Sequence, residues 1–192
     1  VDWGLEESFR KSLFQVIAFI TTTGFVTEDL TNIQGASILK VIFFLLLFMG
    51  GSAGSTAGGI KIVRHLVIFK NSWLEFKRLL HPSGIIPVRY NGNSVQGRIT
   101  FNVMAFIIIY LMIFGFGSIV MAATGLDFET AIGATATSIG NVGPSIGGVC
   151  PVCNFSGISA FGKLFLSLLM LIGRLEIFSV LILFTPFLWR SC

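Results

Sequence analysis

Charged side chains are scarce in this sequence: Asp, Glu, Lys and Arg make up 11% of its 192 residues. Hydrophobic residues account for 54%, and the mean hydropathy of +0.87 lies well above the range of soluble domains. Residues 99–126 contain no charge at all, over a stretch longer than the roughly 20 residues that cross a bilayer. This composition excludes an ordinary soluble protein and indicates a polytopic membrane chain.

Histidine and cysteine are also rare, with two and three residues. Cys150 and Cys153 form a C-x-x-C pair, but neither a histidine nor a second cysteine pair completes a zinc site. We therefore expect no side-chain metal centre and no cofactor, while a disulfide between these two cysteines stays open. Val1 leads directly into a charged segment, so no signal peptide is predicted, and the missing initiator Met suggests a chain that begins within a longer protein.

The few charges are unevenly distributed along the chain. Segment 61–98 is basic and contains a single acid, Glu75, whereas most other acids lie near two glycine-containing turns. Basic segments of membrane proteins stay in the cytoplasm, so the turns are predicted to face outside, where acids concentrate cations. Topology explains the basic residues fully, without a lipid or nucleic-acid ligand. They are Lys61, Arg64, Lys70, Lys77, Arg78, Arg89 and Arg98.

One layout occurs twice: a short amphipathic helix, a glycine-centred turn and a long apolar helix. The first copy starts with residues 9–25 and the second with residues 128–144. Duplicated helix–turn–helix units in a membrane chain suggest re-entrant loops that meet around an axis, as in ion filters. At one constant spacing, Ile20 matches Ile139 and Gly24 matches Gly143. After a small gap, Lys40 matches Lys163 and Gly50 matches Gly173.

The turns could coordinate a dehydrated cation through backbone carbonyls that replace its water shell. Gly24 and Gly143 are the expected pivots, because such a turn needs backbone angles that other residues avoid. The C-terminal end of each short helix would add partial negative charge. The alternative is a pair of ordinary outer loops, which the duplication and the Thr-Thr-Thr-Gly context disfavour.

Segment 50–59 has an unusual composition for a membrane helix. Its glycines and hydroxyl residues predict an unwound break inside the membrane that could obstruct an ion path and move aside. Small-residue helix packing is the alternative, since Gly54 and Gly58 form G-x-x-x-G. The segment also matches the G-x-S-x-G of serine hydrolases at Ser52, but the two histidines, His65 and His81, lie in the basic stretch. The residues assigned to the gate are Gly50, Gly51, Ser52, Gly54, Ser55, Gly58 and Gly59.

Arg174 is an isolated cation within a long apolar stretch. A charge at such a depth costs about 2.5–3.5 kcal/mol on insertion scales, so it normally faces a cavity or a partner. Glu176 is two positions away and points to another side of a helix. Arg174 is expected either to raise the barrier of a cation path or to form a structural ion pair with another helix.

The remaining pattern predicts helices joined by short turns. Asp127 is a candidate N-cap for the second short helix, and Asn91-Gly92 is a candidate tight turn after a short strand at 85–90. The expected helices cover residues 6–20, 35–49, 60–80, 96–123, 127–138 and 159–189.

The chain resembles the C-terminal half of the Trk-type potassium uptake proteins, TrkH-like members of the Trk/Ktr/HKT superfamily. The resemblance implies an all-α polytopic membrane protein made of helix–pore-loop–helix repeats, of which four surround one pore and two are present here. Residues 1–80 would be the third repeat without its first helix, 81–96 a cytoplasmic linker, and 97–192 the complete fourth repeat. The matching segments are 21–25, 50–61, 81–82, 87–89, 134–136, 140–144 and 169–190.

The resemblance also implies roles for individual residues and partners. Segment 50–59 resembles the intramembrane loop that gates the pore below the filter, and Arg174 resembles the family arginine beside that loop. Family members are homodimers in the bacterial inner membrane, in contact with membrane lipid, and a cytosolic nucleotide-binding ring (TrkA-like) regulates them. Such a protein is no enzyme and transports potassium; a serine protease using Ser52 and a non-transporting scaffold are the alternatives. The implied K⁺ ligands are backbone carbonyls of Thr22, Thr23, Gly24, Asn141, Val142 and Gly143.

Overall fold

The computed structural model describes residues 4–27, 36–81, 86–146, 148, 155–175 and 177–183. Most of the described elements are helices. The described strands are two residues long and form two-stranded sheets. In chain order the elements are α1 (Leu5–Ile20), α2 (Ala36–Leu46), β1 (Met49–Gly50), β2 (Ile60–Lys61), α3 (Ile62–Leu80), β3 (Arg89–Tyr90), β4 (Asn93–Ser94), α4 (Gly97–Ala123), α5 (Phe128–Gly140), η2 (Phe155–Gly157), α6 (Ala160–Arg174) and α7 (Ile177–Leu183).

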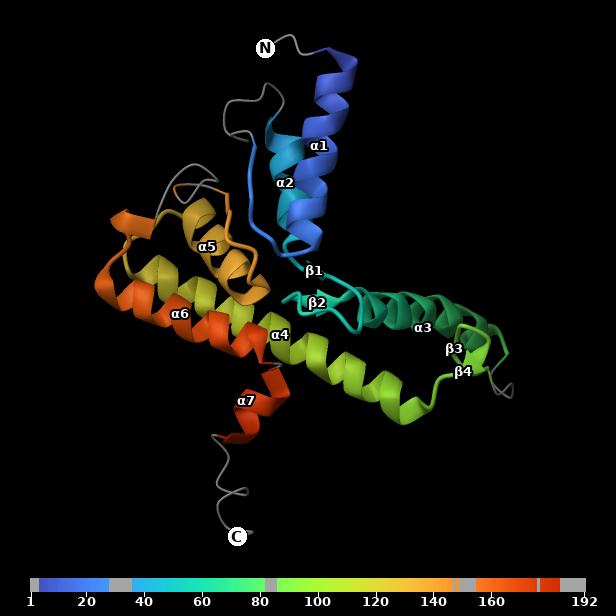
Figure 1. Ribbon diagram of the computed structural model, residues 1–192. Coiled ribbons are helices and arrows are strands. Elements are labelled where there is room, and N and C mark those ends of the chain that lie inside the picture. Colours follow the sequence, from blue (N-terminus) through green and yellow to red (C-terminus); the bar gives the residue numbers. More distant parts are fainter. Residues whose placement is uncertain are drawn as a thin grey trace.

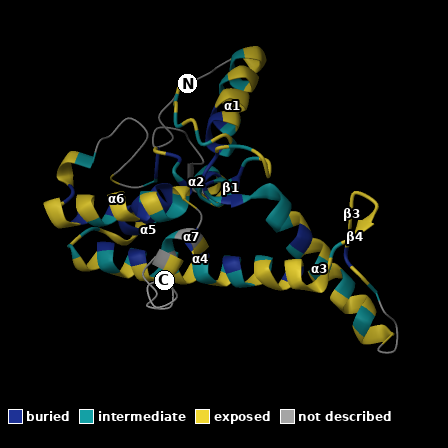
Figure 2. Ribbon diagram, turned by 60° about the horizontal axis from the view of Figure 1, so that its bottom comes forward, coloured by how far each residue is buried: buried dark blue, intermediate teal, exposed yellow. Residues whose placement is uncertain are grey.

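Helix α5 is the most enclosed element. It packs against α4 and α6, which run side by side, while α1 and α2 form a second pair (Figure 1). Its sequence is rich in Ala, Gly, Thr and Ser, whose small side chains let neighbouring helices approach closely. By contrast, α1 exposes Phe9, Leu13 and Ile17, and much of its surface is exposed in Figure 2. The two matching short helices therefore have different surroundings in this chain.

Buried aromatic and aliphatic side chains join the two helix groups. Phe19 of α1 packs with Phe43 and Leu47, and this cluster continues to Ala136 of α5 and Val142. The rings of Phe19 and Phe43 lie 5.0 Å apart. This shared core holds the end of α1 near the end of α5.

Several predicted elements are confirmed. Asp127 caps α5 by accepting a hydrogen bond from the Thr130 amide at 3.2 Å. Asn91 and Gly92 have φ values of +50° and +84°, as a tight hairpin turn between β3 and β4 requires. Among the described helices, α4 alone has the length and low charge needed to cross a bilayer.

The prediction of one helix over 159–189 is wrong. Helix α6 ends at Arg174, where Leu175 donates a last hydrogen bond to the Leu171 carbonyl at 3.1 Å, and α7 begins at Ile177. Gly173 lies directly before the break, but residues 174–177 contain neither Gly nor Pro, and the apolar pattern on both sides predicts a single helix. Cys150, Cys153, Glu176 and residues 184–192 lie outside the described residues.

Candidate functional site

The two glycine-containing turns follow the same backbone path. Thr22 and Asn141 both have left-handed φ values, +53° and +55°. Two residues later, Gly24 and Gly143 also have positive φ values, +78° and +107°. Left-handed residues are uncommon, so their recurrence at matching positions reflects a real duplication. The alignment of the two turns is thereby confirmed at the level of single residues, whereas the matched Gly50 and Gly173 lie in different elements, β1 and α6.

Both turns direct consecutive amides back at the preceding helix. The N–H of Thr23 donates to the Ala18 carbonyl at 3.0 Å. The N–H of Val142 donates to the Thr137 carbonyl at 3.1 Å, which is the matching bond in the second copy. The flanking amides behave alike: Thr22 donates to Phe19 (3.1 Å), Gly24 to Ala18 (3.5 Å), Asn141 to Ser138 (3.2 Å) and Gly143 to the Thr137 hydroxyl (2.9 Å).

The carbonyls of the turns have no donors among the described residues. When consecutive N–H groups gather on one side of a chain, the corresponding carbonyls lie on the other side. Within the described part of the chain, no N–H or O–H group donates to the carbonyls of Thr22, Thr23, Asn141 or Val142. These oxygens follow the partially negative C-terminal ends of α1 and α5. Such an arrangement can coordinate a dehydrated cation.

The two turns meet. A Cβ atom added to Gly24 would overlap the Val142 carbonyl oxygen, and one added to Gly143 would lie 3.9 Å from the Gly24 Cα atom. Gly24 therefore needs glycine both for its φ value and for close approach, whereas Gly143 needs it for its φ value alone. The turns are adjacent parts of one site.

The segment after α2 forms a loop that lies against both turns. Strands β1 and β2 pair in parallel and bracket residues 51–59, which are non-helical as predicted. The amide of Gly58 donates to the Thr22 hydroxyl at 3.4 Å. A Cβ atom at Gly58 would come within 2.5 Å of the Gly140 carbonyl oxygen and 2.8 Å of Asn141 Cβ. Only a residue without a side chain fits at this contact.

Lys61 holds the loop in place through hydrogen bonds to its backbone. Its Nζ donates to the carbonyl oxygens of Ser55 at 2.5 Å and Ala57 at 2.9 Å. Sequence reasoning missed this role, because Lys61 was counted only as one of the basic residues that indicate topology. Its position directly after the glycine-rich segment was the available signal.

Arg174 lies at the end of α6, beside the loop. It lines a cavity of about 380 Å³ together with Gly54, Ser55 and Thr56 of the loop. Lys61 and Arg64 line the same cavity, and the guanidinium of Arg64 sits over the Phe106 ring at 3.8 Å. The structure thus brings Arg174 together with the loop.

Three further contacts fix the site, and the sequence did not predict them. Gly173 lies so close to the Ile139 carbonyl that a side chain there would overlap it. The Asn141 amide donates from Nδ2 to the Met170 carbonyl at 3.1 Å, which ties the second turn to α6. Leu47 presents its carbonyl oxygen 2.6 Å from where a Gly140 Cβ would lie. A close contact between two backbone segments leaves no pattern in the sequence except the glycine that permits it.

Ser52 lacks the setting of a hydrolase nucleophile. It stands in the loop between β1 and β2, not at a strand-to-helix turn. Its carbonyl accepts hydrogen bonds from the Ser55 amide at 3.0 Å and hydroxyl at 2.8 Å. In the described part of the chain, the ring of His65 bonds the Lys61 carbonyl at 3.4 Å and no histidine bonds Ser52. The geometry gives the protease alternative no support.

Acidic groups lie at the N-terminal ends of the two short helices, α1 and α5. Hydrogen bonds from the Thr130 side chain and amide hold the pKa of Asp127 below its ordinary value. In the same way, a hydrogen bond from Lys11 lowers the pKa of Glu7. Glu129 forms an ion pair with Lys40 of α2 at 2.9 Å. Asp127 and Glu7 therefore keep their negative charge at neutral pH.

Known proteins share this sequence and fold. The TrkH family model, described as a cation transport protein, matches residues 3–191. The Trk system potassium uptake protein TrkH of Halomonas elongata is 35% identical over 190 residues, 99% of this chain and 39% of that protein. Its counterpart in Escherichia coli K12 is 35% identical over 96% of this chain and 37% of that protein.

A solved structure gives the same result. The crystal structure of the potassium transporter TrkH from Vibrio parahaemolyticus matches with a TM-score of 0.86 and 34% identity. The match covers 98% of this chain and 40% of that one, so the chain spans about two fifths of the length of these relatives. Its fold is that of a helical membrane transporter, and the chain belongs to the TrkH family of cation transport proteins.

Proposed function

We propose that this chain supplies two of the four filter strands of a potassium transport protein. Backbone carbonyls of Thr22, Thr23 and Gly24, with those of Asn141, Val142 and Gly143, would replace the water shell of K⁺. One observation carries the proposal: the two turns share their left-handed residues and amide bonds, and they touch at Gly24. The relatives named as potassium uptake proteins support K⁺ as the ion.

Loop 51–59 is the proposed gate. It lies against both turns through Gly58, so any ion that leaves these carbonyls passes the loop. The single pairing of β1 with β2, two residues long, and the Lys61 hydrogen bonds hold it, which is a small set of interactions to break when the loop moves aside. Arg174 lines the cavity beside the loop, where a positive charge raises the barrier for a cation.

Two strands do not enclose an ion, so transport requires further repeats. Helix α5 is covered by α4 and α6, whereas α1 leaves Phe9, Leu13 and Ile17 exposed. In a four-repeat protein, this apolar face of α1 would pack against neighbouring helices in the same way. On that basis residues 1–80 form the third repeat without its first helix, 81–96 a cytoplasmic linker and 97–192 the fourth repeat.

The assembly proposed for the whole protein is a homodimer in the bacterial inner membrane, regulated by a cytosolic nucleotide-binding ring. The basic segment 61–98, including the exposed Lys77 and Arg98, is the surface on which such a ring would dock. The positive charge of this segment also agrees with a cytoplasmic location.

Ion selectivity tests the proposal. In a full-length version of the protein, Gly24→Ser and Gly143→Ser should lower the ratio of rubidium to sodium uptake by about tenfold, because forcing a side chain to a positive φ costs about 1–2 kcal/mol. Gly115→Ser is the matched control, since nothing lies within 4 Å of an added Cβ atom there. Unchanged selectivity in both turn variants, with normal amounts of folded protein, would contradict the filter assignment.

A further inference from the structure

Helix α3 and the segment that leads into the β3–β4 hairpin enclose an apolar groove on the surface of the molecule. The cavity measures about 830 Å³, within the range of about 300–1,000 Å³ typical of small-molecule sites. Leu66, Phe69, Trp73 and Leu74 of α3 form its apolar wall, and Lys70 and Arg89 add two cations. We call this feature the α3 groove.

The apolar wall is exposed although it belongs to a long amphipathic helix. Leu66, Phe69 and Trp73 recur at helical spacing on one face, and Phe69 and Trp73 are 72% and 63% exposed. In a membrane protein, tryptophan at such a site marks the boundary between hydrocarbon and headgroups. The face thus suits a partner with an apolar body and a polar end.

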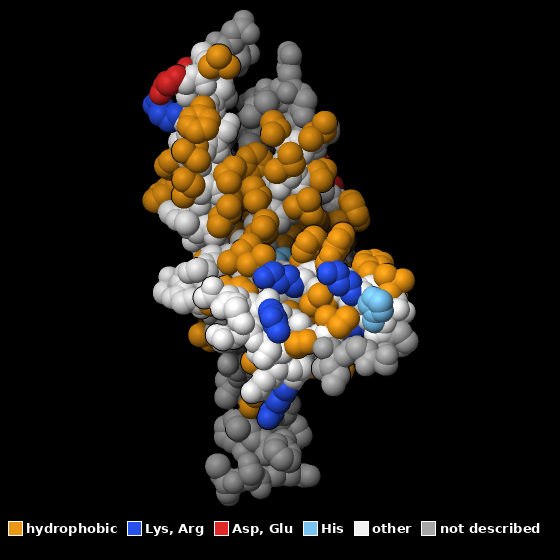
Figure 3. Space-filling model, turned by 90° about the vertical axis from the view of Figure 1, so that its right-hand side faces the viewer, with side chains coloured by type: hydrophobic (Ala, Val, Ile, Leu, Met, Phe, Trp, Pro, Cys, Tyr) orange, Lys and Arg blue, Asp and Glu red, His pale blue; other side chains and the backbone are white. Residues whose placement is uncertain are grey.

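The two cations belong to opposite walls, and the Lys70 ammonium reaches the backbone of Arg89 across the groove. Lys70 Nζ donates to the Arg89 carbonyl at 3.3 Å and lies 5.9 Å from the centre of the Tyr90 ring. None of the acids that the structure describes forms an ion pair with Lys70 or Arg89. Figure 3 shows Lys and Arg side chains next to hydrophobic ones on this side of the molecule, with the acidic side chains of that view lying elsewhere.

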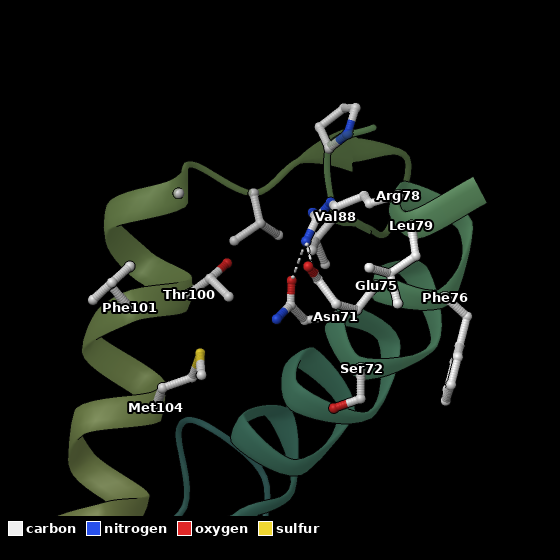
Figure 4. Close-up of a pocket in the computed structure, with 13 residues that line it drawn as sticks. Asn71, Ser72, Glu75, Phe76, Arg78, Leu79, Val88, Thr100, Phe101 and Met104 are labelled. Carbon is white, nitrogen blue, oxygen red and sulfur yellow. Dashed lines mark hydrogen bonds and ion pairs between the residues drawn. The ribbon is translucent and has the colours of Figure 1, made fainter. Parts of the chain in front are cut away.

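A second cavity, which also has Pro87 in its lining, differs from the α3 groove in how its cation is bonded. It measures about 740 Å³ and lies between α3 and the start of α4 (Figure 4). Its cation, Arg78, bonds Glu75 at 2.7 Å, Asn71 at 3.0 Å and the Ile86 carbonyl at 2.9 Å. Arg78 is therefore paired with an acid within the protein, whereas neither cation of the α3 groove forms an ion pair with an acid that the structure describes.

We propose that the α3 groove binds an anionic phospholipid of the cytoplasmic leaflet. Its phosphate would lie between Lys70 and Arg89, and an acyl chain would lie along Leu66, Phe69 and Leu74. Basic pockets at the cytoplasmic side of membrane helices bind anionic headgroups in this way. A lipid fits better than a protein partner because two cations that pair with none of the described acids adjoin an apolar wall that carries a Trp at its surface.

Lipid retention tests the charge recognition. The full-length protein is reconstituted with equal amounts of phosphatidylglycerol and phosphatidylcholine, re-extracted, and its bound lipids are counted by native mass spectrometry. The double variant Lys70→Gln/Arg89→Gln should retain about tenfold less phosphatidylglycerol, because each cation near an anionic surface contributes to binding. Lys77→Gln removes one positive charge from an exposed position of α3 outside the groove and should retain as much phosphatidylglycerol as the parent. Equal retention by all three proteins would overturn the proposal.

Fluorescence quenching tests the location. Phosphatidylglycerol brominated on its acyl chains should quench Trp73, as judged by the signal lost in Trp73→Phe, and should do so more than brominated phosphatidylcholine. Equal quenching by both lipids would overturn the anionic specificity. No quenching of Trp73 by either lipid would mean that protein covers the groove, from another part of the same chain, a second copy or a regulatory partner, and would overturn the proposal as a whole.

Discussion

Lys61 Nζ lies 2.9 Å from the carbonyl oxygen of Ala57, so a cation at the end of β2 binds the loop that precedes this strand. The same ammonium group bonds the Ser55 carbonyl at 2.5 Å. Hydrogen bonds from a charged donor are among the stronger ones in proteins. Because Gly58 is the next residue along and touches both turns, the Lys61 contacts help to fix the loop against the filter candidate.

Replacing Lys61 by Met should loosen this loop. The variant removes both carbonyl contacts while keeping a side chain of similar length, so amide exchange in residues 51–59 should accelerate at least tenfold, as expected from about 1.5–3 kcal/mol per charged hydrogen bond. If the loop is the gate, rubidium uptake by the full-length protein should rise as well.

Lys77→Met is the control for that experiment, since Lys77 is an exposed lysine on the same helix. Exchange in the loop should match the parent protein in this variant. An unchanged exchange rate in Lys61→Met would show that the bracketing strands alone hold the loop.

Arg174 offers a separate test of the gate. Arg174→Ala should raise ion flux several-fold, because it removes a positive charge from the cavity beside the loop. Arg174→Lys keeps the charge and should resemble the parent protein. A fall in flux for Arg174→Ala at normal expression would instead indicate that the arginine forms a structural ion pair.

The duplication of the turns could be read from the sequence because it depends on local chemistry. Gly24 and Gly143 supply positive φ values that other residues adopt at a cost, and the match of Thr22 with Asn141 follows from their spacing. A capping Asp and an Asn-Gly turn have similarly local causes, so Asp127 and the hairpin were also predictable.

Contacts between distant segments could not be predicted in the same way. The end of α6 at Arg174 lies where Gly173 meets the Ile139 carbonyl, 34 residues away in a different helix, and a single glycine in an apolar stretch does not by itself predict that end. The role of Lys61 depends on how the loop folds back. The pairing of Lys40 with Glu129 likewise depends on how α2 and α5 are placed.

That ion pair between Lys40 and Glu129 links the two copies of the repeat and predicts a measurable coupling. The side chains are 31% and 45% exposed, so solvent screens them and the pair should contribute only about 0.2–1 kcal/mol. In thermal denaturation of the full-length protein, Lys40→Glu should lower the melting temperature by repulsion from Glu129.

The double variant Lys40→Glu/Glu129→Lys should recover most of that loss by restoring opposite charges. Lys163 provides the control, because it matches Lys40 in the repeat but bonds the Ser156 carbonyl at 3.2 Å. Lys163→Glu should not be rescued by Glu129→Lys, and equal rescue of both would argue against a specific pair.

Asp127 makes the start of α5 sensitive to acid. Hydrogen bonds from Thr130 lower the pKa of this carboxyl in the folded state, so they stabilise the helix above the unfolded-state pKa and are lost as the pH falls through the folded value. Amide exchange in the first turn of α5 should therefore accelerate below about pH 4, once corrected for the intrinsic effect of pH. Asp127→Asn keeps a capping acceptor without a titrating group and should remove this acceleration. If parent and variant respond to pH in parallel, the cap bond to Thr130 does not control the stability of that turn.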